Sequence, residues 1–368
     1  MLVFGTRPEA IKMAPIVRCL TRRPGVMPLV CVTAQHRQML DQVLELFGIR
    51  PDHDLDIMRR AQGLTYVTTA ALEGLSEVFA RAKPDRVLVQ GDTTTAFAAA
   101  LAAFYAGIPV GHVEAGLRTG DIHAPWPEEV NRKLIAGIAD IHFAPTATSR
   151  RNLLREGVDA ARIHVTGNTG IDALLDAVDI LQSDPKRKAE ADASVPRLDS
   201  ERRIILVTGH RRENFNGGLA RVAHGLRRIA DRGDVELVYP VHLNPAVQQV
   251  AQEWLGGHPR IHLVEPLDYL PFVNLMRRAH LVVTDSGGVQ EEAPSLGKPV
   301  VVTRDTTERP EAIEAGTVHL VGTDTERLVA RVNCLLDQPA AYAAASFIHN
   351  PYGDGRAAGR IVEALLHA

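Results

Sequence analysis

Residues 280–303 read HLVVTDSGGVQEEAPSLGKPVVVT and contain a strand–turn–helix–strand pattern. Two β-branched runs, HLVVTD and PVVVT, enclose a segment that opens with Ser286, Gly287 and Gly288. This spacing is typical of parallel strands joined by a helix. Glycines at such a turn leave backbone N–H groups accessible, and the helix dipole favours an anion there. The stretch therefore predicts an α/β fold with a phosphate site, while Ser286 acting only as a helix cap is the alternative.

The same alternation continues along the chain, where helical stretches such as TTAFAAALAAFYAG separate short apolar runs. We predict two doubly wound Rossmann-like α/β domains that face each other across a cleft, because strands alternating with helices form parallel sheets covered on both faces. Segment 182–200 has few large apolar residues and is interpreted as a surface segment near the join. NPYGDGRAAG (350–359) is interpreted as a turn that opens the last helix. The candidate strands are residues 2–4, 28–33, 86–90, 109–114, 141–145, 162–167, 203–209, 235–242, 260–266, 280–285, 299–303 and 318–322.

Composition excludes several classes of function. A chain of 368 residues with 45% hydrophobic and 23% charged residues is typical of a globular protein of about two domains. The net charge of −3 does not favour nucleic acid or an anionic membrane as a partner. The sequence shows no membrane-spanning run and no signal peptide, and its three scattered cysteines favour a reducing cytoplasm.

Cofactor motifs are absent from the sequence. No GxGxxG follows the first strand, and Walker A, GxSxG and HExxH patterns do not occur. These absences argue against a nicotinamide enzyme, a P-loop nucleotide-binding protein, an esterase and a zincin. Polar residues instead follow many candidate strands, where the ligand crevice of an open α/β sheet lies.

Basic and acidic residues at these strand ends suit a nucleotide and acid–base chemistry. Arginine and lysine near the turns could bind phosphate, or be ordinary solvated surface cations; these are Arg7, Lys12, Arg304 and Arg309. Glu292 lies one helical turn after Gly288 and could accept hydrogen bonds from ribose hydroxyls, whereas Glu291 points elsewhere and is interpreted as structural.

Three acids, Asp92, Glu114 and Glu128, form the candidate catalytic set, with His210 as a proton donor or a counter-charge to phosphate. Each has an ordinary alternative. Asp92 could cap the helix that follows it, and Glu128, after Pro127, could occupy a first helical turn.

These residues occur in ten blocks, in an order that resembles the bacterial non-hydrolysing UDP-N-acetylglucosamine 2-epimerases. The resemblance runs from residue 3 to about residue 360. The blocks are FGTRPEAIKMAP, VTAQHRQMLDQVL, GDTTT, GHVEAGLRTGD, PWPEEVNR, TGHRREN, VYPVHLNP, TDSGGVQEEAPSLGKP, RDTTERPE and NPYGDG.

The resemblance implies a glycosyltransferase-B type fold whose final helix returns to the first domain. We therefore expect a first domain at 1–169 plus helix 354–368, and a UDP-binding second domain at 170–353. It also implies reversible conversion of UDP-GlcNAc to UDP-ManNAc by elimination and re-addition of UDP through 2-acetamidoglucal, without cofactor or metal. A homodimer that serves bacterial surface polysaccharide synthesis is expected.

The resemblance also assigns residues. It implies Asp92, Glu114, Glu128 and His210 as catalytic, and Arg7, Lys12, Leu267, Phe272, Ser286, Gly287, Gly288, Glu292 and Arg309 as substrate-binding. Gln35, His36, Gln62 and His242 match positions at which relatives bind a second UDP-GlcNAc as activator, although His242 could instead only cap its turn. Leu267 departs from the glutamine of many relatives, which is compatible with a backbone contact but not with a side-chain contact.

Three other functions fit parts of the same pattern. A hydrolysing epimerase or a glycosyltransferase could use the same fold, since fold alone does not fix function. A hydrolysing enzyme often carries a fused kinase domain, for which 368 residues leave no room. A non-catalytic nucleotide-sugar sensor could dispense with Asp92, Glu114 or Glu128, all of which are present.

Overall fold

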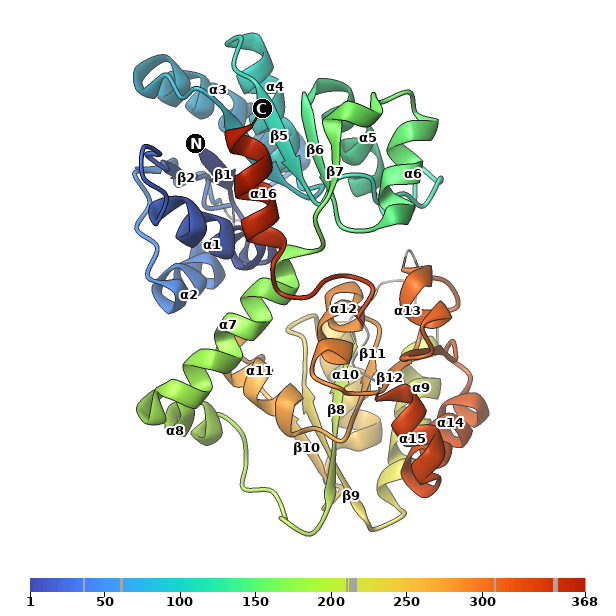
Figure 1. The fold of residues 1–368 in the computed structure, drawn as a ribbon. Coiled ribbons are helices and arrows are strands. Elements are labelled where there is room, and N and C mark those ends of the chain that lie inside the picture. The colour runs from blue at the N-terminus through green and yellow to red at the C-terminus, as the bar shows by residue number, and fades with distance from the viewer. Residues whose placement is uncertain are drawn as a thin grey trace. The chain divides into compact units, whose positions relative to one another are not determined.

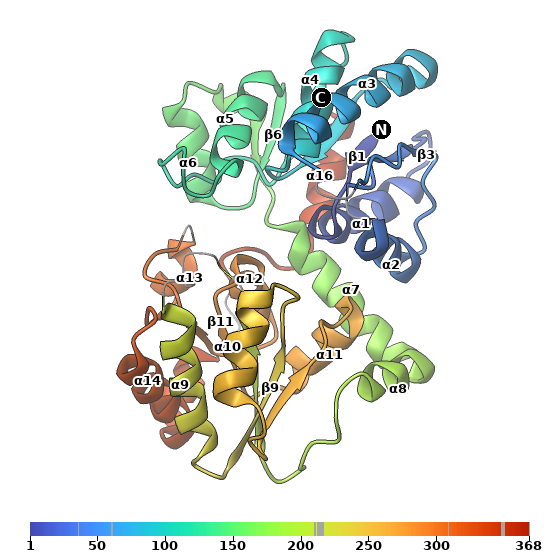
Figure 2. The ribbon, with the colours of Figure 1, turned by 180° about the vertical axis from the view of Figure 1, so that it is seen from behind.

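The computed structural model divides into two compact units, which Figures 1 and 2 show from opposite sides. Unit 1 comprises Met1–Ala173 and Tyr352–Ala368, and unit 2 comprises Leu174–Pro351. The residues described are 1–367 without 36, 60, 61, 210, 212–216, 308 and 347–349, and without the side chains of Gln38 and Pro310.

Unit 1 contains a parallel sheet of seven strands in the order β3-β2-β1-β4-β5-β6-β7. Its strands are β1 (Leu2–Phe4), β2 (Val30–Val32), β3 (His53–Asp54), β4 (Val87–Gln90), β5 (Val110–Val113), β6 (Ile141–Ala144) and β7 (Ile163–Val165). Its helices are α1 (Arg7–Thr21), α2 (Arg37–Phe47), α3 (Leu64–Ala82), α4 (Thr94–Tyr105), α5 (Glu128–Ile138), α6 (Ala147–Arg155), the 3-10 helix Ala160–Arg162 and α16 (Ala357–Leu366), while α7 (Thr169–Ser183) contains the boundary with unit 2.

Unit 2 contains a parallel sheet of six strands in the order β10-β9-β8-β11-β12-β13. Its strands are β8 (Arg203–Thr208), β9 (Val235–Pro240), β10 (Ile261–Val264), β11 (Leu281–Thr284), β12 (Val300–Val302) and β13 (Val318–Leu320). Its helices are α8 (Pro185–Ala193), α9 (Gly218–Ala230), α10 (Pro245–Leu255), α11 (Tyr269–Arg278), α12 (Gly287–Ser295), α13 (Pro310–Glu314), α14 (Thr325–Asp337) and α15 (Pro339–Ala345).

The two sheets confirm the predicted α/β class and all twelve predicted strands. Six of the twelve predicted strands lie in unit 1, and the structure adds a seventh there, the edge strand β3, which was not predicted. This strand has two residues, His53 and Asp54, and pairs with β2. A two-residue polar strand has no apolar alternation that could be recognised in the sequence.

Helices cover the sheets for recognisable reasons. Helix α4 is rich in alanine, and its small side chains let it pack between α3 and α5 and close to β4.

The last helix, α16, lies beside α1 within unit 1 (Figure 1), and the turn expected at 350–359 precedes it. The segment 182–200, predicted only as surface, contains α8, which Asp184 caps by accepting hydrogen bonds from Lys186 N and Arg187 N.

None of the helices described combines the length and the apolar character needed to cross a membrane. Cys19, Cys31 and Cys334 are not joined in disulfides.

Candidate functional site

The order of strands in each sheet brings distant segments together at one edge. In unit 1, β1 and β4 are neighbours, so the chain after β1 (Gly5, Arg7) lies near the chain after β4 (Gly91, Asp92). In unit 2, β8 and β11 are neighbours, so Gly209 lies near the start of the glycine turn. Such points, where the strand order reverses, are the usual ligand sites of open α/β sheets.

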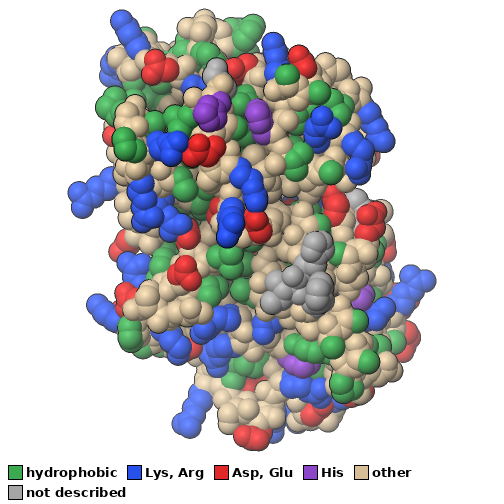
Figure 3. Space-filling model, viewed as in Figure 1, with side chains coloured by type: hydrophobic (Ala, Val, Ile, Leu, Met, Phe, Trp, Pro, Cys, Tyr) green, Lys and Arg blue, Asp and Glu red, His purple; other side chains and the backbone are tan. Residues whose placement is uncertain are grey.

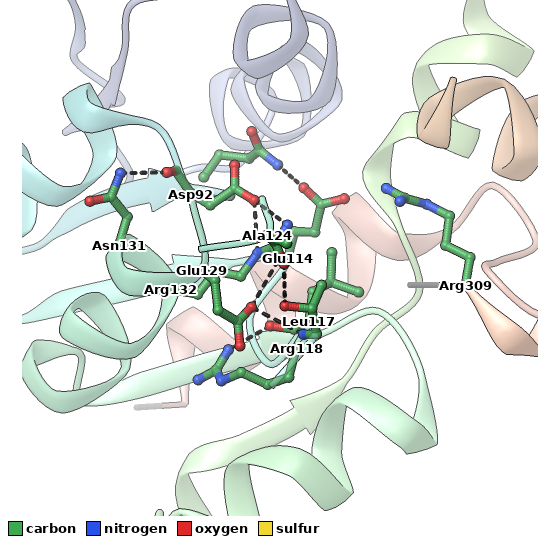
Figure 4. Close-up of polar contacts among 12 residues, drawn as sticks. Asp92, Glu114, Leu117, Arg118, Ala124, Glu129, Asn131, Arg132 and Arg309 are labelled. Carbon is green, nitrogen blue, oxygen red and sulfur yellow. Dashed lines mark hydrogen bonds and ion pairs between the residues drawn. The ribbon is translucent and has the colours of Figure 1, made fainter. Parts of the chain in front are cut away.

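Asp92 follows β4 and is held by helix α5, as Figure 4 shows. Its Oδ2 accepts hydrogen bonds from Arg132 Nε at 2.8 Å and pairs with Nη2 at 2.6 Å. Asn131 Nδ2 donates to the Asp92 carbonyl at 2.8 Å. The interpretation of Asp92 as the cap of α4 is wrong, because Thr93 accepts that hydrogen bond from Ala96 N.

Glu114 follows β5 and lies beside the same turn. Its carboxylate accepts hydrogen bonds from Lys12 and Gln90, and from Asn168 Nδ2 at 3.0 Å. A Cβ atom on Gly91 would lie 3.5 Å from Glu114 Oε2. Glu114 adopts a φ of +63°, in the left-handed region that is costly for a residue with a Cβ and is found preferentially at functional sites.

Glu128 is the first residue of α5, with Pro127 at the N-cap, so the prediction that it lies in a first helical turn is confirmed. Its Oε2 is buried and has no hydrogen-bond partner among the residues described. The neighbouring Glu129 is fully buried, pairs with Arg132 at 3.1 Å and accepts hydrogen bonds from the backbone of the loop before α5 at Thr119 and Gly120.

Arg132 therefore connects Asp92 to the helix that begins with Glu128, while Gly91 connects Asp92 to Glu114. The three predicted acids converge at one edge of unit 1. A buried carboxylate oxygen beside charge-paired carboxylates can accept or deliver a proton and can stabilise positive charge on a sugar ring.

Three residues that support this edge were missed by the sequence analysis. Arg132 and Asn168 form the bonds described above. Glu9 is buried and accepts hydrogen bonds from Gly5 N, Thr6 N and Thr93 Oγ1, at 3.1, 2.8 and 2.6 Å. Burial raises the pKa of the Glu9 carboxyl. The sequence signal that could have identified Glu9 is its spacing. It stands three residues after Thr6 at the start of α1, as in a capping box.

The glycine turn of unit 2 is built around Arg309. Ser286 occupies the N-cap position of α12, but its side chain makes no capping hydrogen bond, so the cap alternative is wrong. A Cβ on Gly287 would lie 2.5 Å from Arg309 Nη1, whereas one on Gly288 would meet no described atom within 4 Å. Arg309 is buried, and its Nε donates to Glu291 on α12. Glu291 therefore has the structural role that was predicted for it, because it positions Arg309.

The other predicted substrate-binding residues are distributed over both units. Arg304 is buried, as is Arg309, so neither is a solvated surface cation. Arg7 begins α1 and Lys12 lies on the same helix, where it pairs with Glu114. Leu267 is buried, Phe272 lies on α11, and Glu292 is half-buried on α12.

His210 lies outside the described residues, but both of its neighbours are anchored. Tyr239 Oη donates to the Gly209 carbonyl at 2.9 Å, and Arg211 N donates to Asp285 Oδ2 at 2.8 Å. Tyr239 and Asp285 are both buried. These contacts anchor the described residues on either side of position 210.

The predicted activator residues form local contacts within their own units. Gln62 Nε2 donates to the Gln35 carbonyl at 2.9 Å, and Gln35 Oε1 accepts from Thr95 Oγ1 at 3.1 Å. His242 Nδ1 accepts from Asn244 N at 3.1 Å, which confirms that His242 caps its turn. His36 lies outside the described residues.

Two parallel Rossmann-like sheets, each with polar residues at its carboxyl edge, place the chain in the class of glycosyltransferase-B type α/β proteins. The family model described as UDP-N-acetylglucosamine 2-epimerase matches residues 18–366. The chain belongs to the UDP-N-acetylglucosamine 2-epimerase family.

Individual relatives agree with this assignment. The chain is 58% identical over 366 residues to the UDP-N-acetylglucosamine 2-epimerase of Escherichia coli K12, covering 99% of this chain and 97% of that protein. Its structure is similar to that of the UDP-GlcNAc 2-epimerase from Neisseria meningitidis bound to UDP-GlcNAc, with a TM-score of 0.95, 49% identity and coverage of 100% and 99%. The enzyme from Methanocaldococcus jannaschii in complex with UDP-GlcNAc and UDP gives a TM-score of 0.85, 35% identity and coverage of 100% and 99%.

Proposed function

We propose that this chain interconverts UDP-GlcNAc and UDP-ManNAc by elimination and re-addition of UDP. The observation that carries the proposal is the convergence of Asp92, Glu114 and Glu128 at the carboxyl edge of the unit 1 sheet. Membership of the UDP-N-acetylglucosamine 2-epimerase family supports the substrate.

The elimination step requires a base and a stabilised leaving group. A carboxylate accepts the C2 proton, the C1–O bond breaks with its electron pair going to UDP, and the C1–C2 double bond of 2-acetamidoglucal forms. Because C2 is not activated by an adjacent ketone, positive charge builds at C1, and nearby carboxylates stabilise it. Re-addition of UDP with a proton delivered to the other face gives the epimer.

Glu128 is assigned to proton transfer, because its Oε2 is buried without a described partner. Asp92 and Glu114 are held by Arg132 and Lys12 and are assigned to charge stabilisation. His210 is assigned to the leaving diphosphate or to its protonation.

Unit 2 is assigned to UDP. The backbone at Ser286, Gly287 and Gly288 and the guanidinium of Arg309 suit the diphosphate, since helix N-termini and arginine both bind phosphate oxygens. Glu292 is assigned to the ribose hydroxyls. Arg7, Leu267 and Phe272 are retained as substrate-binding residues on the resemblance.

The test is incubation of the full chain with UDP-GlcNAc in D2O, followed by NMR. We expect UDP-ManNAc to appear with deuterium at C2 in both epimers. Epimerisation without solvent deuterium would exclude the elimination, and accumulation of free ManNAc with UDP would identify a hydrolysing enzyme instead.

We also propose that UDP-GlcNAc acts as an activator through Gln35, His36, Gln62 and His242. Purified UDP-ManNAc should then react slowly until traces of UDP-GlcNAc are added. His242→Ala should remove this lag more than it weakens UDP binding. Full initial velocity from UDP-ManNAc alone would contradict activation.

A homodimer that serves surface polysaccharide synthesis is proposed on the resemblance. Phe104 and Tyr105 at the end of α4 are 61% and 70% exposed, and an apolar pair of this kind suits a subunit contact. Light scattering during size-exclusion chromatography measures the mass directly, and a monomer at micromolar concentration would contradict the dimer.

A further inference from the structure

A basic groove lies on unit 2, away from the glycine turn. Two adjoining cavities of about 670 and 480 Å³ share Leu198 and Arg278. Figure 3 shows Lys and Arg side chains gathered over this part of unit 2, around α8, α11 and the segment that leads to β8. Two aspartates, Asp192 and Asp199, line the cavities together with the cations Lys188, Arg197, Arg202, Arg203, Arg277, Arg278 and Lys298.

Four of these cations are paired with carboxylates. Asp192 pairs with Lys188 and Arg278, Asp199 with Arg202, and Asp234 with Arg203. In the part of the chain that the structure describes, no carboxylate lies within ion-pair distance of the remaining three, which are Arg197, Arg277 and Lys298. The groove therefore carries uncompensated positive charge.

Two of these uncompensated cations are also partly withdrawn from water. Arg277 Nε is buried and has no hydrogen-bond partner among the described residues, and its Nη2 reaches Asn274 Oδ1 only at 3.4 Å. Burial, and after it the charge of Arg277, lowers the pKa of Lys298. The neighbouring His280 stacks on Tyr342 with ring centroids 4.1 Å apart, and its Nε2 is buried without a described partner.

The groove lies at the edge of the sheet opposite to the glycine turn. Arg203 is the first residue of β8, His280 directly precedes β11, and Lys298 stands two residues before β12. Ser286 follows the other end of β11, roughly 13 Å away along a strand of four residues. A ligand at the amino edge would therefore be separate from one at the glycine turn.

We propose that this groove is a second anion site that takes a phosphate-type dianion. A dianion would compensate both Arg277 and Lys298, whereas a single carboxylate would compensate one of them. The planar guanidinium matches two phosphate oxygens, and Lys298 supplies a point charge beside it. His280 Nε2 can donate a third hydrogen bond when it carries the proton.

The probe is inorganic pyrophosphate, titrated calorimetrically into the full chain at low salt, with and without excess UDP. We expect a binding step that persists in excess UDP. Lys298→Met and Arg277→Met should each weaken this step roughly ten- to a hundredfold, as expected for loss of a charged hydrogen bond. Lys298→Arg should retain it, and Arg228→Met, which removes an exposed pair with Glu326 elsewhere on unit 2, should leave it unchanged.

A thermal melt without anion provides the second measurement. Lys298→Met should not lower the melting temperature, because it removes a desolvated charge that its neighbours repel. Pyrophosphate binding that disappears in excess UDP, or that is equally tight in both methionine variants, would overturn the proposal.

Discussion

The carboxyl edges of the two sheets carry opposite kinds of chemistry. The edge of unit 1 is a network of side chains, in which Asp92 and Glu114 are each paired with a cation from another element. At the edge of unit 2, the backbone at Gly288 is open. The buried side chain of Arg309 is held there by an ion pair with Glu291 on α12. One sheet architecture thus supports a network of charged side chains in one unit and, in the other, an open glycine turn that we propose as an anion cradle.

This difference predicts how each edge should respond to mutation. In unit 1, Asp92 and Glu114 are fixed by Arg132 and Lys12, and Glu128 begins the helix that carries Arg132, so substitutions there should affect turnover or folding. A cradle made of backbone needs only space and one cation, so substitutions in unit 2 should affect affinity. The following variants test this contrast.

Glu128→Gln should give the largest effect on activity. The amide cannot accept the substrate proton, so kcat should fall roughly 10²- to 10⁴-fold, while UDP affinity stays constant. Glu73→Gln on the exposed face of α3 is the matched control. Steady-state rates measure kcat, and calorimetry measures UDP affinity. A normal kcat in Glu128→Gln would show that Glu128 does not transfer the proton.

Arg132→Met should be the most destabilising variant. It leaves the fully buried Glu129 and the partly buried Asp92 without their cation, and breaking a buried pair costs about 3–5 kcal/mol. Arg228→Met breaks a solvent-exposed pair and should destabilise the chain far less, because water and salt screen such a pair. Urea unfolding measures both, and equal losses would show that the unit 1 network contributes no more than a surface pair.

Glu292→Gln should weaken UDP binding by about 1–1.5 kcal/mol, because the proposed charged hydrogen bond to the ribose, worth about 1.5–3 kcal/mol, becomes a neutral one worth about 0.5–1.5 kcal/mol. Turnover at saturating substrate should change less than in Glu128→Gln. Calorimetry with UDP is the measurement, and unchanged affinity would place the ribose elsewhere.

Gly287→Ala and Gly288→Ala form a pair that separates packing from ligand access. The Cβ at 287 would displace Arg309 and should cost about 1–3 kcal/mol of stability. The Cβ at 288 meets no described atom within 4 Å, so stability should be retained while UDP affinity falls if the diphosphate lies there. Thermal melts with and without UDP distinguish the two, and equal melting temperatures without ligand would contradict the contact with Arg309.

His112 makes the stability of unit 1 depend on pH. Burial lowers the pKa of His112 to about 3, from its ordinary value of 6.5, and its Nε2 donates to the Gly91 carbonyl at 2.7 Å. The unfolded chain then binds more protons below pH 6.5, so stability is lost as the pH falls, by about 1.4 kcal/mol per pH unit. His112→Gln should flatten this dependence between about pH 6 and 4, and an unchanged slope in urea titrations would show that His112 does not cause it.

Local sequence predicted most of the fold, because apolar alternation and glycine turns are local properties. Prediction from local sequence failed where a segment had few apolar residues, or where one sequence pattern fits two different structural roles. The strand His53–Asp54 and the helix Pro185–Ala193 carry few apolar residues, and their neighbours determine them. The capping hypotheses for Asp92, Ser286 and His242 rested on the same kind of pattern, and only that for His242 is confirmed.

The sequence by itself determined the strand–helix alternation, the glycine turn at 286–288 and the presence of the acids at strand ends. Only the tertiary structure decided which cation holds each acid. Arg132 reaches Asp92 across 40 residues and Lys12 reaches Glu114 across 102 residues, because strand order places β4 between β1 and β5. Ion pairs depend on distance in space, and no periodicity along the chain encodes them.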